Sequence, residues 1–142
     1  MPPQTNVDLV NRLWQEAINT HNLQKSHEFC SANYLHHDSS LPGKDIRGLN
    51  NYLNTISPFF TAFPDLRLEV QDMISEGSKV ASRGTFTGTH KAELMGIPAT
   101  GKRVAVSIIA IHRVSRGKVV EGWVQFDAMG MMQQLGAIPS PR

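Results

Sequence analysis

The spacing of apolar residues changes once along the chain, at Phe63-Pro64-Asp65, and this change constrains the fold more than any other feature. Before it, apolar residues recur every three or four positions over 6–19 and 48–63, as they do on one face of a helix. After it, apolar and polar residues alternate from Leu66 onward, as they do in a half-buried strand. Helices followed by a meandering sheet predict an α+β fold rather than repeated βαβ units.

The predicted elements fit one domain, 1–142, because a domain of this kind has about 150 residues. Pro58 is expected to kink or split the helix that contains it. Gly84 and Gly88 lie inside a predicted strand and indicate bulges or strong curvature, so we expect the sheet to bend around a pocket. The expected elements are helices over 6–19, 23–30 and 48–63, a loop over 31–45, about four long antiparallel strands over 66–74, 79–90, 102–114 and 118–127, and a short helix from about 128.

Charge and cysteine content exclude several classes of protein. The chain has 14 Lys and Arg against 12 Asp and Glu, a net charge of +2, and these cations do not cluster, so nucleic acid is not an expected partner. The single cysteine, Cys30, cannot form an intramolecular disulfide, which favours a reducing compartment. The longest apolar run, 104–111, is far shorter than the roughly 20 residues that span a bilayer. The N-terminus lacks a signal-peptide pattern, so we expect a cytoplasmic protein without a membrane anchor.

Asp127 is the most informative carboxylate, because it ends a predicted strand next to apolar residues. Period two places Glu121, Trp123, Gln125 and Asp127 on one face of that strand. Beside Phe126 the carboxylate is expected to be partly desolvated, with a raised pKa, and it could then remove a proton from carbon next to a carbonyl. Alternatively, Asp127 caps the helix that follows, and spacing alone favours the cap.

His112 lies within the most apolar predicted strand, where a catalytic role and a core position fit the sequence equally well. A two-residue turn after this strand would put His112 on the face of Asp127, whereas a three-residue turn would put Ser107 there. In the pair His36-His37, at most one side chain is expected to enter a pocket, because neighbours in extended chain point opposite ways. For either histidine alone, a solvated position in a loop is favoured over a functional one. The candidate substrate-binding residues are Trp14, His37, Phe59, His90, Trp123 and Gln125.

Motifs of other common sites are absent from the sequence. No phosphate-loop lysine opens a helix after the glycine-containing segment 88–101, which argues against nucleotide binding. The sequence also has no nucleophile elbow, no Cys-His pair and no spacing typical of metal ligands. We therefore expect neither a nucleotide site nor a metal site.

Several motifs occur in a specific order over nearly the whole chain: 63–66 (FPDL), 85–90 (TFTGTH), 95–102 (MGIPATGK), 117–121 (GKVVE), Trp123, Asp127 and 133–136 (QQLG), with Trp14 and Ala17 in the early helix. In this order they resemble the SnoaL-like polyketide cyclases of the NTF2-like superfamily. The sequence departs from the pattern in two places. Gly122 stands where a histidine or another larger residue often occurs, and Met131-Met132 replace the usual leucine pair.

The resemblance implies a fold and a reaction. The fold is a cone of curved antiparallel sheet closed by helices, and members of the family commonly pair through the sheet. The reaction is a cofactor-free intramolecular aldol condensation of an apolar substrate in a deep pocket, with Asp127 at the position of the acid/base. This favours Asp127 as a catalyst over a cap, with His112, Gln125 or His37 as hydrogen-bond donors to the developing enolate. Alternatives within the superfamily are a non-catalytic carrier protein and another lyase or hydrolase.

Two further expectations concern surfaces. Residues 104–111 are apolar on both faces of their strand, so the face turned away from the helices needs cover, and we expect a homodimer through the sheet. The segment 88–101 is longer than an ordinary hairpin loop and contains Leu94, Met95 and Ile97. These side chains are expected to fold inward, either as a partial lid over the pocket or as a plug at the edge of the core.

Overall fold

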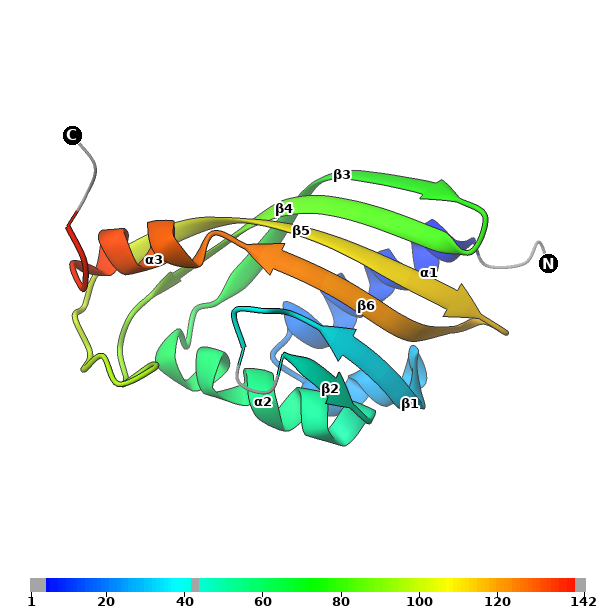
Figure 1. The fold of residues 1–142 in the computed structure, drawn as a ribbon, viewed down its shortest axis with the longest axis horizontal. Helices are drawn as coiled ribbons and strands as arrows, with labels where there is room; N and C mark the ends of the chain where they lie inside the picture. The colour runs from blue at the N-terminus through cyan, green and yellow to red at the C-terminus, as the bar shows by residue number, and fades with distance from the viewer. Residues whose placement is uncertain (1–4, 42–43, 140–142) are drawn as a thin grey trace.

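The computed structural model describes residues 5–41 and 44–139 and contains a curved six-stranded sheet with helices packed against it (Figure 1). The helical elements are α1 (Asn6–Arg12), continued by the π-helix η1 (Leu13–Ile18), the 3-10 helix η2 (Leu23–Glu28), α2 (Leu49–Ala62) and α3 (Ala128–Leu135). The strands are β1 (Cys30–His37), β2 (Asp45–Arg47), β3 (Arg67–Glu76), β4 (Lys79–Thr89), β5 (Arg103–Ser115) and β6 (Lys118–Phe126). Their order in the sheet is β2-β1-β6-β5-β4-β3; β1 and β6 are parallel, and the other neighbours are antiparallel.

The first helix is fixed at both ends. The Thr5 side chain accepts a hydrogen bond from Asp8 N at 3.0 Å and caps α1. The helix then widens into η1, where Asn19 N donates to Trp14 O at 2.9 Å, five residues back. The Asn19 side chain accepts from Leu68 N at 2.7 Å and donates to Leu68 O at 2.9 Å. This pair of bonds holds the end of the helix against β3, the edge strand of the sheet.

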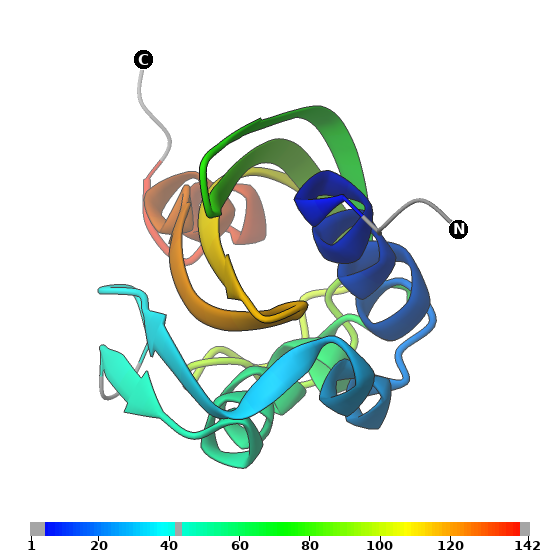
Figure 2. The same ribbon diagram turned by 90° about the vertical axis from the view of Figure 1, so that its right-hand side faces the viewer.

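The sheet curls around the interior, with α1 and α2 on its open side (Figure 2). The register of β3 and β4 shifts by one residue beside Gly84, where a Cβ would lie 2.7 Å from the carbonyl oxygen of Glu69. A Cβ at Gly88 would lie 2.8 Å from Cβ of Phe63. The predicted α+β class is therefore confirmed, and so is the predicted bulge beside Gly84. No register shift accompanies Gly88, where the missing side chain instead lets Phe63 pack close to the strand.

The region 31–45 was expected to be a loop, and this prediction is wrong. It contains most of β1 and the start of β2, so the sheet has six strands rather than about four, and one pair is parallel. The buried side chains of β1 include Tyr34 and His36, which are polar at one end, so the apolar alternation of an ordinary strand is missing there.

Helix α2 continues through Pro58, so of the two expected effects of this proline, a kink or a split, the split does not occur. Proline removes one backbone hydrogen bond from the interior of the helix. Packing against the rest of the protein offsets this loss, because Leu49, Leu53 and Ala62 of α2 are buried in the core. Helix η2 ends at Glu28 and is therefore shorter than the predicted helix over 23–30. Cys30, the last residue of that predicted helix, is the first residue of β1.

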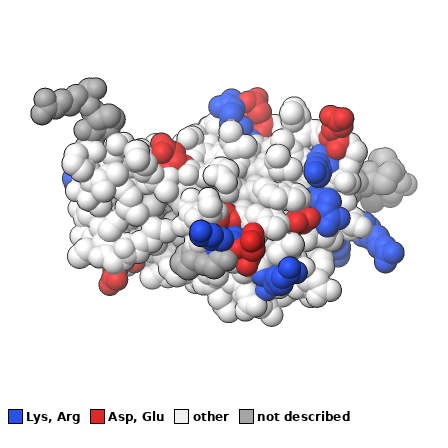
Figure 3. Space-filling model, viewed as in Figure 1, with Lys and Arg blue, Asp and Glu red and all other residues white. Residues whose placement is uncertain are grey.

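The surface carries Lys and Arg close to Asp and Glu, in small mixed groups, on the face shown in Figure 3. This face therefore carries no continuous cationic stripe of the kind that binds a nucleic-acid backbone. No helix within residues 5–41 and 44–139 is long and apolar enough to cross a membrane.

Candidate functional site

An apolar pocket lies inside the curve of the sheet. The empty volume of this pocket is about 630 Å³, which includes solvent space at its open mouth. The walls come from η1, α2 and the inner faces of β3 to β6, and the largest side chains among them are Trp14, Tyr52, Phe59, Phe60, Phe86 and Phe126. Such a surface favours an apolar ligand with few polar groups.

Two polar groups enter this pocket from the end of β1. His36 and Asp38 are two residues apart in extended chain, so both side chains point to the same side, and both line the pocket. Their exposed fractions are 1% and 4%. A titratable pair held in an apolar enclosure is typical of a site for proton transfer.

His36 is a neutral imidazole at physiological pH. Burial, helped by the charges that His112 and His37 can carry, lowers the pKa of His36 to about 3. The Tyr34 hydroxyl lies 2.8 Å from His36 Nδ1, and the Tyr52 ring packs on the imidazole with centroids 4.2 Å apart. These contacts fix the position of the imidazole.

Asp38 is the carboxyl of the pocket. Burial raises its pKa above the ordinary value, against hydrogen bonds from Ser40 that favour the ionised form. One of these bonds runs from Ser40 N to Asp38 Oδ1 at 2.8 Å, and Asp38 N also donates to Lys44 O at 2.8 Å. The carboxyl is therefore held in place and is a stronger base than an exposed aspartate.

His112 is buried behind the pocket wall rather than in the lining. It lies edge-on to Trp14, with ring centroids 5.3 Å apart and an interplanar angle of 71°. Burial lowers the pKa of His112 to about 4. Its Nδ1 and the Trp14 Nε1 have no hydrogen-bond partner among the residues that the structure describes.

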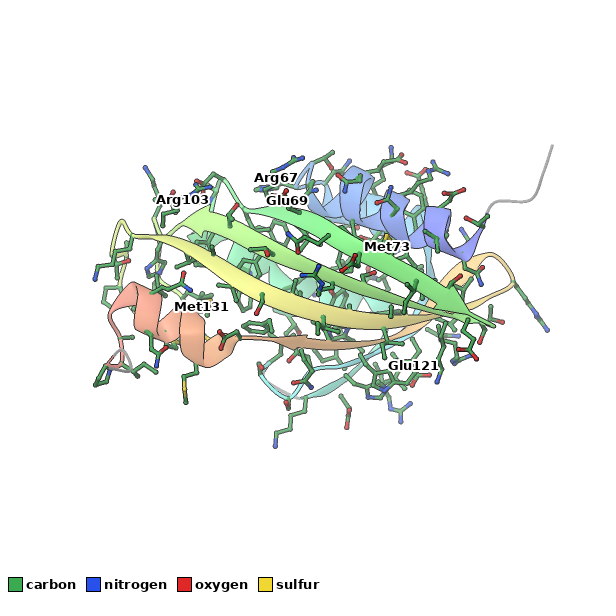
Figure 4. All side chains as sticks on the ribbon, turned by 90° about the horizontal axis from the view of Figure 1, so that it is seen from above. Arg67, Glu69, Met73, Arg103, Glu121 and Met131 are labelled. Atoms are coloured by element: carbon green, nitrogen blue, oxygen red, sulfur yellow. The ribbon has the colours of Figure 1, made fainter. Side chains whose placement is uncertain are left out.

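Asp127 lies outside the pocket. Its side chain is exposed and accepts a hydrogen bond from Gly130 N at 2.9 Å, which makes it the N-cap of α3. The expectation of a desolvated carboxylate is wrong, because Val124 and Phe126 turn toward the pocket and the alternate residues of β6 turn to the outer face. Figure 4 looks onto that outer face.

The register explains which neighbour Asp127 has. A bulge between Arg113 and Val114 adds one residue to the β5–β6 pairing, although the turn itself has two residues. Asp127 N consequently donates to Ser107 O at 3.0 Å, and His112 lies on the buried side. Ser107, Gln125 and Asp127 share a depression on the outer face, with an empty volume of about 620 Å³.

Of the other predicted residues, the structure brings Trp14 and Phe59 together in the pocket lining. His37 points away and bonds Asp45 and Glu121, and its ring stacks on Trp123 at 5.3 Å between centroids. His37, Trp123 and Gln125 are therefore not in the lining of the inner pocket.

His90 is also outside the lining. It is fully buried, packs against Phe63 and bonds Thr100 at 3.0 Å. In the following loop Leu94 is buried in the core, but Met95 is 43% exposed, so the expectation that Met95 folds inward is wrong. No residue of this loop lines the pocket, which agrees with a plug rather than a lid.

Sequence reasoning missed Asp38 and Tyr52 as pocket residues and left His36 undecided. The sequence signal for Asp38 was its spacing of two residues from His36. In extended chain this spacing places both side chains on the same side, but it is informative only once the segment is known to be extended. Among the described residues, no three His, Cys, Asp or Glu side chains lie close enough to hold a metal ion.

Both a family model and individual proteins of known name match this chain over most of its length. The model of the SnoaL-like polyketide cyclase family matches residues 8–135. The aklanonic acid methyl ester cyclase DnrD of Streptomyces peucetius is 29% identical over 133 residues, which are 93% of this chain and 91% of DnrD. DauD of Streptomyces sp. strain C5, which is also named an aklanonic acid methyl ester cyclase, is 30% identical over 137 residues. These residues are 96% of this chain and 83% of DauD.

Solved structures agree in fold. Wild-type IdmH from Streptomyces antibioticus has a TM-score of 0.82 and 30% identity, and the match covers 94% of this chain and 99% of IdmH. AclR from Streptomyces galilaeus, a candidate hydroxylase, has a TM-score of 0.83 and 29% identity over 94% of this chain and 82% of AclR. The curved sheet and its helices are thus shared with proteins whose sequences match this one almost from end to end. The chain belongs to the SnoaL-like polyketide cyclase family.

Proposed function

We propose that this protein closes a ring in an apolar polyketide-like substrate by an aldol-type reaction inside the inner pocket, with Asp38 as the acid/base. The observation that carries the proposal is a buried carboxyl, 4% exposed and with a raised pKa, in an otherwise aromatic and aliphatic enclosure. Membership of a cyclase family supports the reaction class.

The proposed step is balanced within one substrate molecule. The Asp38 carboxylate removes a proton from the carbon next to a carbonyl, and the electron pair of that C–H bond delocalises onto the carbonyl oxygen as an enolate. A hydrogen bond from His36 stabilises the charge on this oxygen. The enolate carbon then forms a C–C bond with a second carbonyl carbon of the same molecule. The oxygen of that carbonyl becomes an alkoxide and takes the proton back from Asp38.

The environment suits both halves of this step. Burial makes Asp38 a better base, and its raised pKa brings proton transfer from a weakly acidic carbon closer to thermoneutral. The neutral His36 can donate a hydrogen bond without carrying a charge into the pocket. Exclusion of water by the aromatic walls strengthens both interactions.

The names of DnrD and DauD suggest a first substrate, aklanonic acid methyl ester. Wild-type protein is expected to convert it to an isomer of unchanged mass. In deuterium oxide, the reacting carbon is expected to exchange its proton. Tight binding without conversion or exchange would instead favour the carrier alternative.

The assignment to Asp38 competes with the sequence-based assignment to Asp127. Asp38→Asn removes the basic carboxylate while preserving size, and we expect at least a hundredfold loss of turnover, roughly the contribution of one general base. Asp127→Asn keeps an oxygen that can cap α3 and should turn over at nearly the wild-type rate. The reverse pattern, with Asp38→Asn active and Asp127→Asn inactive, would overturn the proposal.

We also propose a homodimer that pairs through the outer face of the sheet. Ile109 and Ile111 of β5 are 55% and 39% exposed there. Neighbouring isoleucines on a broad sheet face are costly to leave in water, and a second copy of the same face would cover them.

A further inference from the structure

Tyr34 and His36 follow each other on the buried face of β1, and Gly122 of β6 lies beside them. In the register of the sheet, Gly122 is paired with His36 on one side and with His112 on the other. The row His36–Gly122–His112 therefore crosses three adjacent strands, and its middle position has no side chain.

We propose that Tyr34 is a positioning residue that holds His36 in the tautomer protonated at Nε2, and that Gly122 is the residue that makes room for the Tyr34 hydroxyl. The catalytic consequence of this arrangement rests on the proposed function, whereas the tautomer itself does not.

The direction of the hydrogen bond follows from the state of both groups. Tyr34 is 2% exposed, and burial raises the pKa of its phenol well above the ordinary value, so the hydroxyl keeps its hydrogen. Its distance of 2.8 Å to His36 Nδ1 is its one hydrogen bond to the residues that the structure describes. If Nδ1 carried the proton instead, the phenolic hydrogen would be buried without an acceptor among these residues, which is costly. The hydroxyl therefore donates to Nδ1.

A neutral imidazole carries one proton, so a lone pair on Nδ1 requires the proton on Nε2. The pKa of about 3 keeps His36 neutral at physiological pH. Because His36 lines the pocket, the nitrogen left for a ligand is a donor. In the opposite tautomer this nitrogen would be an acceptor, and it would repel a carbonyl or enolate oxygen.

Gly122 explains how the tyrosine reaches this position. A Cβ at Gly122 would overlap the Tyr34 hydroxyl oxygen and would lie 3.2 Å from Tyr34 Cζ and 3.0 Å from His112 Cδ2. The hydroxyl thus occupies the space that a side chain at 122 would fill, between the two histidines. Gly122 is also one of the positions at which this sequence departs from the motif pattern it otherwise resembles.

Nitrogen NMR of the His36 imidazole in the free protein tests the tautomer directly. In wild type we expect a protonated Nε2 and an unprotonated Nδ1. Tyr34→Phe removes the hydroxyl and should produce a mixture of both tautomers. Tyr52→Phe is the matched control, because its ring packs on His36 but makes no hydrogen bond to it, and the tautomer should stay unchanged. A protonated Nδ1 in wild type, or an unchanged tautomer in Tyr34→Phe, would overturn the inference.

Turnover separates this inference from the proposed function. With aklanonic acid methyl ester, Tyr34→Phe should lower kcat about tenfold with little change in KM, as expected for one lost orienting hydrogen bond. If wild type shows no turnover while the tautomer behaves as described, the proposed function fails and the positioning role stands. If wild type is active and Tyr34→Phe has the wild-type kcat, the catalytic consequence is overturned.

A double-mutant cycle tests the role of Gly122 without requiring activity. Gly122→Ala should destabilise the protein more in the wild-type background than in the Tyr34→Phe background, because the second change removes the atom that the new Cβ overlaps. Equal destabilisation in the two backgrounds, measured by urea unfolding, would overturn the assignment of Gly122.

Discussion

His37 connects three strands through one side chain. Its Nδ1 lies 2.7 Å from Asp45 Oδ1 on β2, and its Nε2 lies 2.8 Å from Glu121 Oε2 on β6. The hydrogen bonds to Asp45 and then to Glu121 raise the pKa of His37, against burial, and the bond from His37 is the largest influence that lowers the pKa of Glu121. His37 and Glu121 thus each stabilise the charged form of the other.

The stability of this cluster should depend on pH in a defined direction. A raised His37 pKa stabilises the fold below the ordinary value of 6.5, and this contribution is lost as the pH rises through the folded value. A lowered Glu121 pKa stabilises it above the ordinary value of 4.5, and this is lost on acidification. His37→Gln should therefore cost most between about pH 5 and 6, by up to about 1 kcal/mol, and less above neutrality.

Urea unfolding at several pH values measures this difference. His27→Gln is the matched control, because His27 is an exposed histidine. A cost of His37→Gln that does not change with pH, or that grows above neutrality, would contradict the role assigned to the cluster.

The catalytic candidates were predicted from the sequence less accurately than the fold was. The alternation of residues along β6 correctly grouped Trp123, Gln125 and Asp127 on one face of the strand. Both faces of β6 carry apolar side chains, however, so the alternation did not indicate which face is turned toward the pocket. The bulge between Arg113 and Val114 adds a register shift that the turn residues do not encode. Asp38 was hidden for a different reason, since its strand was not recognised.

Among the elements, α3 is attached to the sheet by a pair of hydrogen bonds made by one glutamine, in addition to the packing of its buried Met131 and Leu135. Gln134 Oε1 accepts a hydrogen bond from Ala105 N at 2.7 Å, and its Nε2 donates to Ala105 O at 2.9 Å. The side-chain amide thereby pairs with a backbone amide of β5 as a neighbouring strand would. This contact continues the hydrogen bonding of β5 beyond the end of β6.

Gln134→Ala should lower the free energy of unfolding by about 1 to 3 kcal/mol, because two hydrogen bonds to the backbone are lost together. Gln133→Ala, one position earlier in α3, is the matched control and should cost less than about 0.5 kcal/mol. Hydrogen exchange at Ala105 N should also become faster in Gln134→Ala. Equal stability of the two variants would show that this attachment contributes nothing.

Long regular elements were predictable, and the short polar strand was not. The four long strands and the two principal helices have clear apolar periodicity, and the structure reproduces them within a few residues. Strand β1 buries Tyr34 and His36 instead, so its inward face reads as polar. Its pairing with β6 joins segments far apart in the chain, and such pairing leaves no local signal.

At the scale of the whole molecule, the outer face of the sheet is the surface expected to form the dimer. Ile109→Lys places a charge at the centre of the exposed β5 face and should convert the dimer to a monomer in sedimentation velocity at micromolar concentration. Met95→Lys changes an exposed apolar residue of the 90–102 loop and should leave the dimer intact. A stable monomer of wild type at this concentration would contradict the proposed dimer.

The central claim is that the substrate binds inside the curve of the sheet, next to Asp38, and not on the outer face, next to Asp127. Ile56 of α2 lines the inner pocket, whereas Ile109 of β5 lines the outer depression. Nuclear Overhauser effects between protons of bound aklanonic acid methyl ester and the isoleucine δ1 methyl groups distinguish the two places. We predict contacts to the Ile56 methyl and none to Ile109; contacts to Ile109 without any to Ile56 would contradict the account.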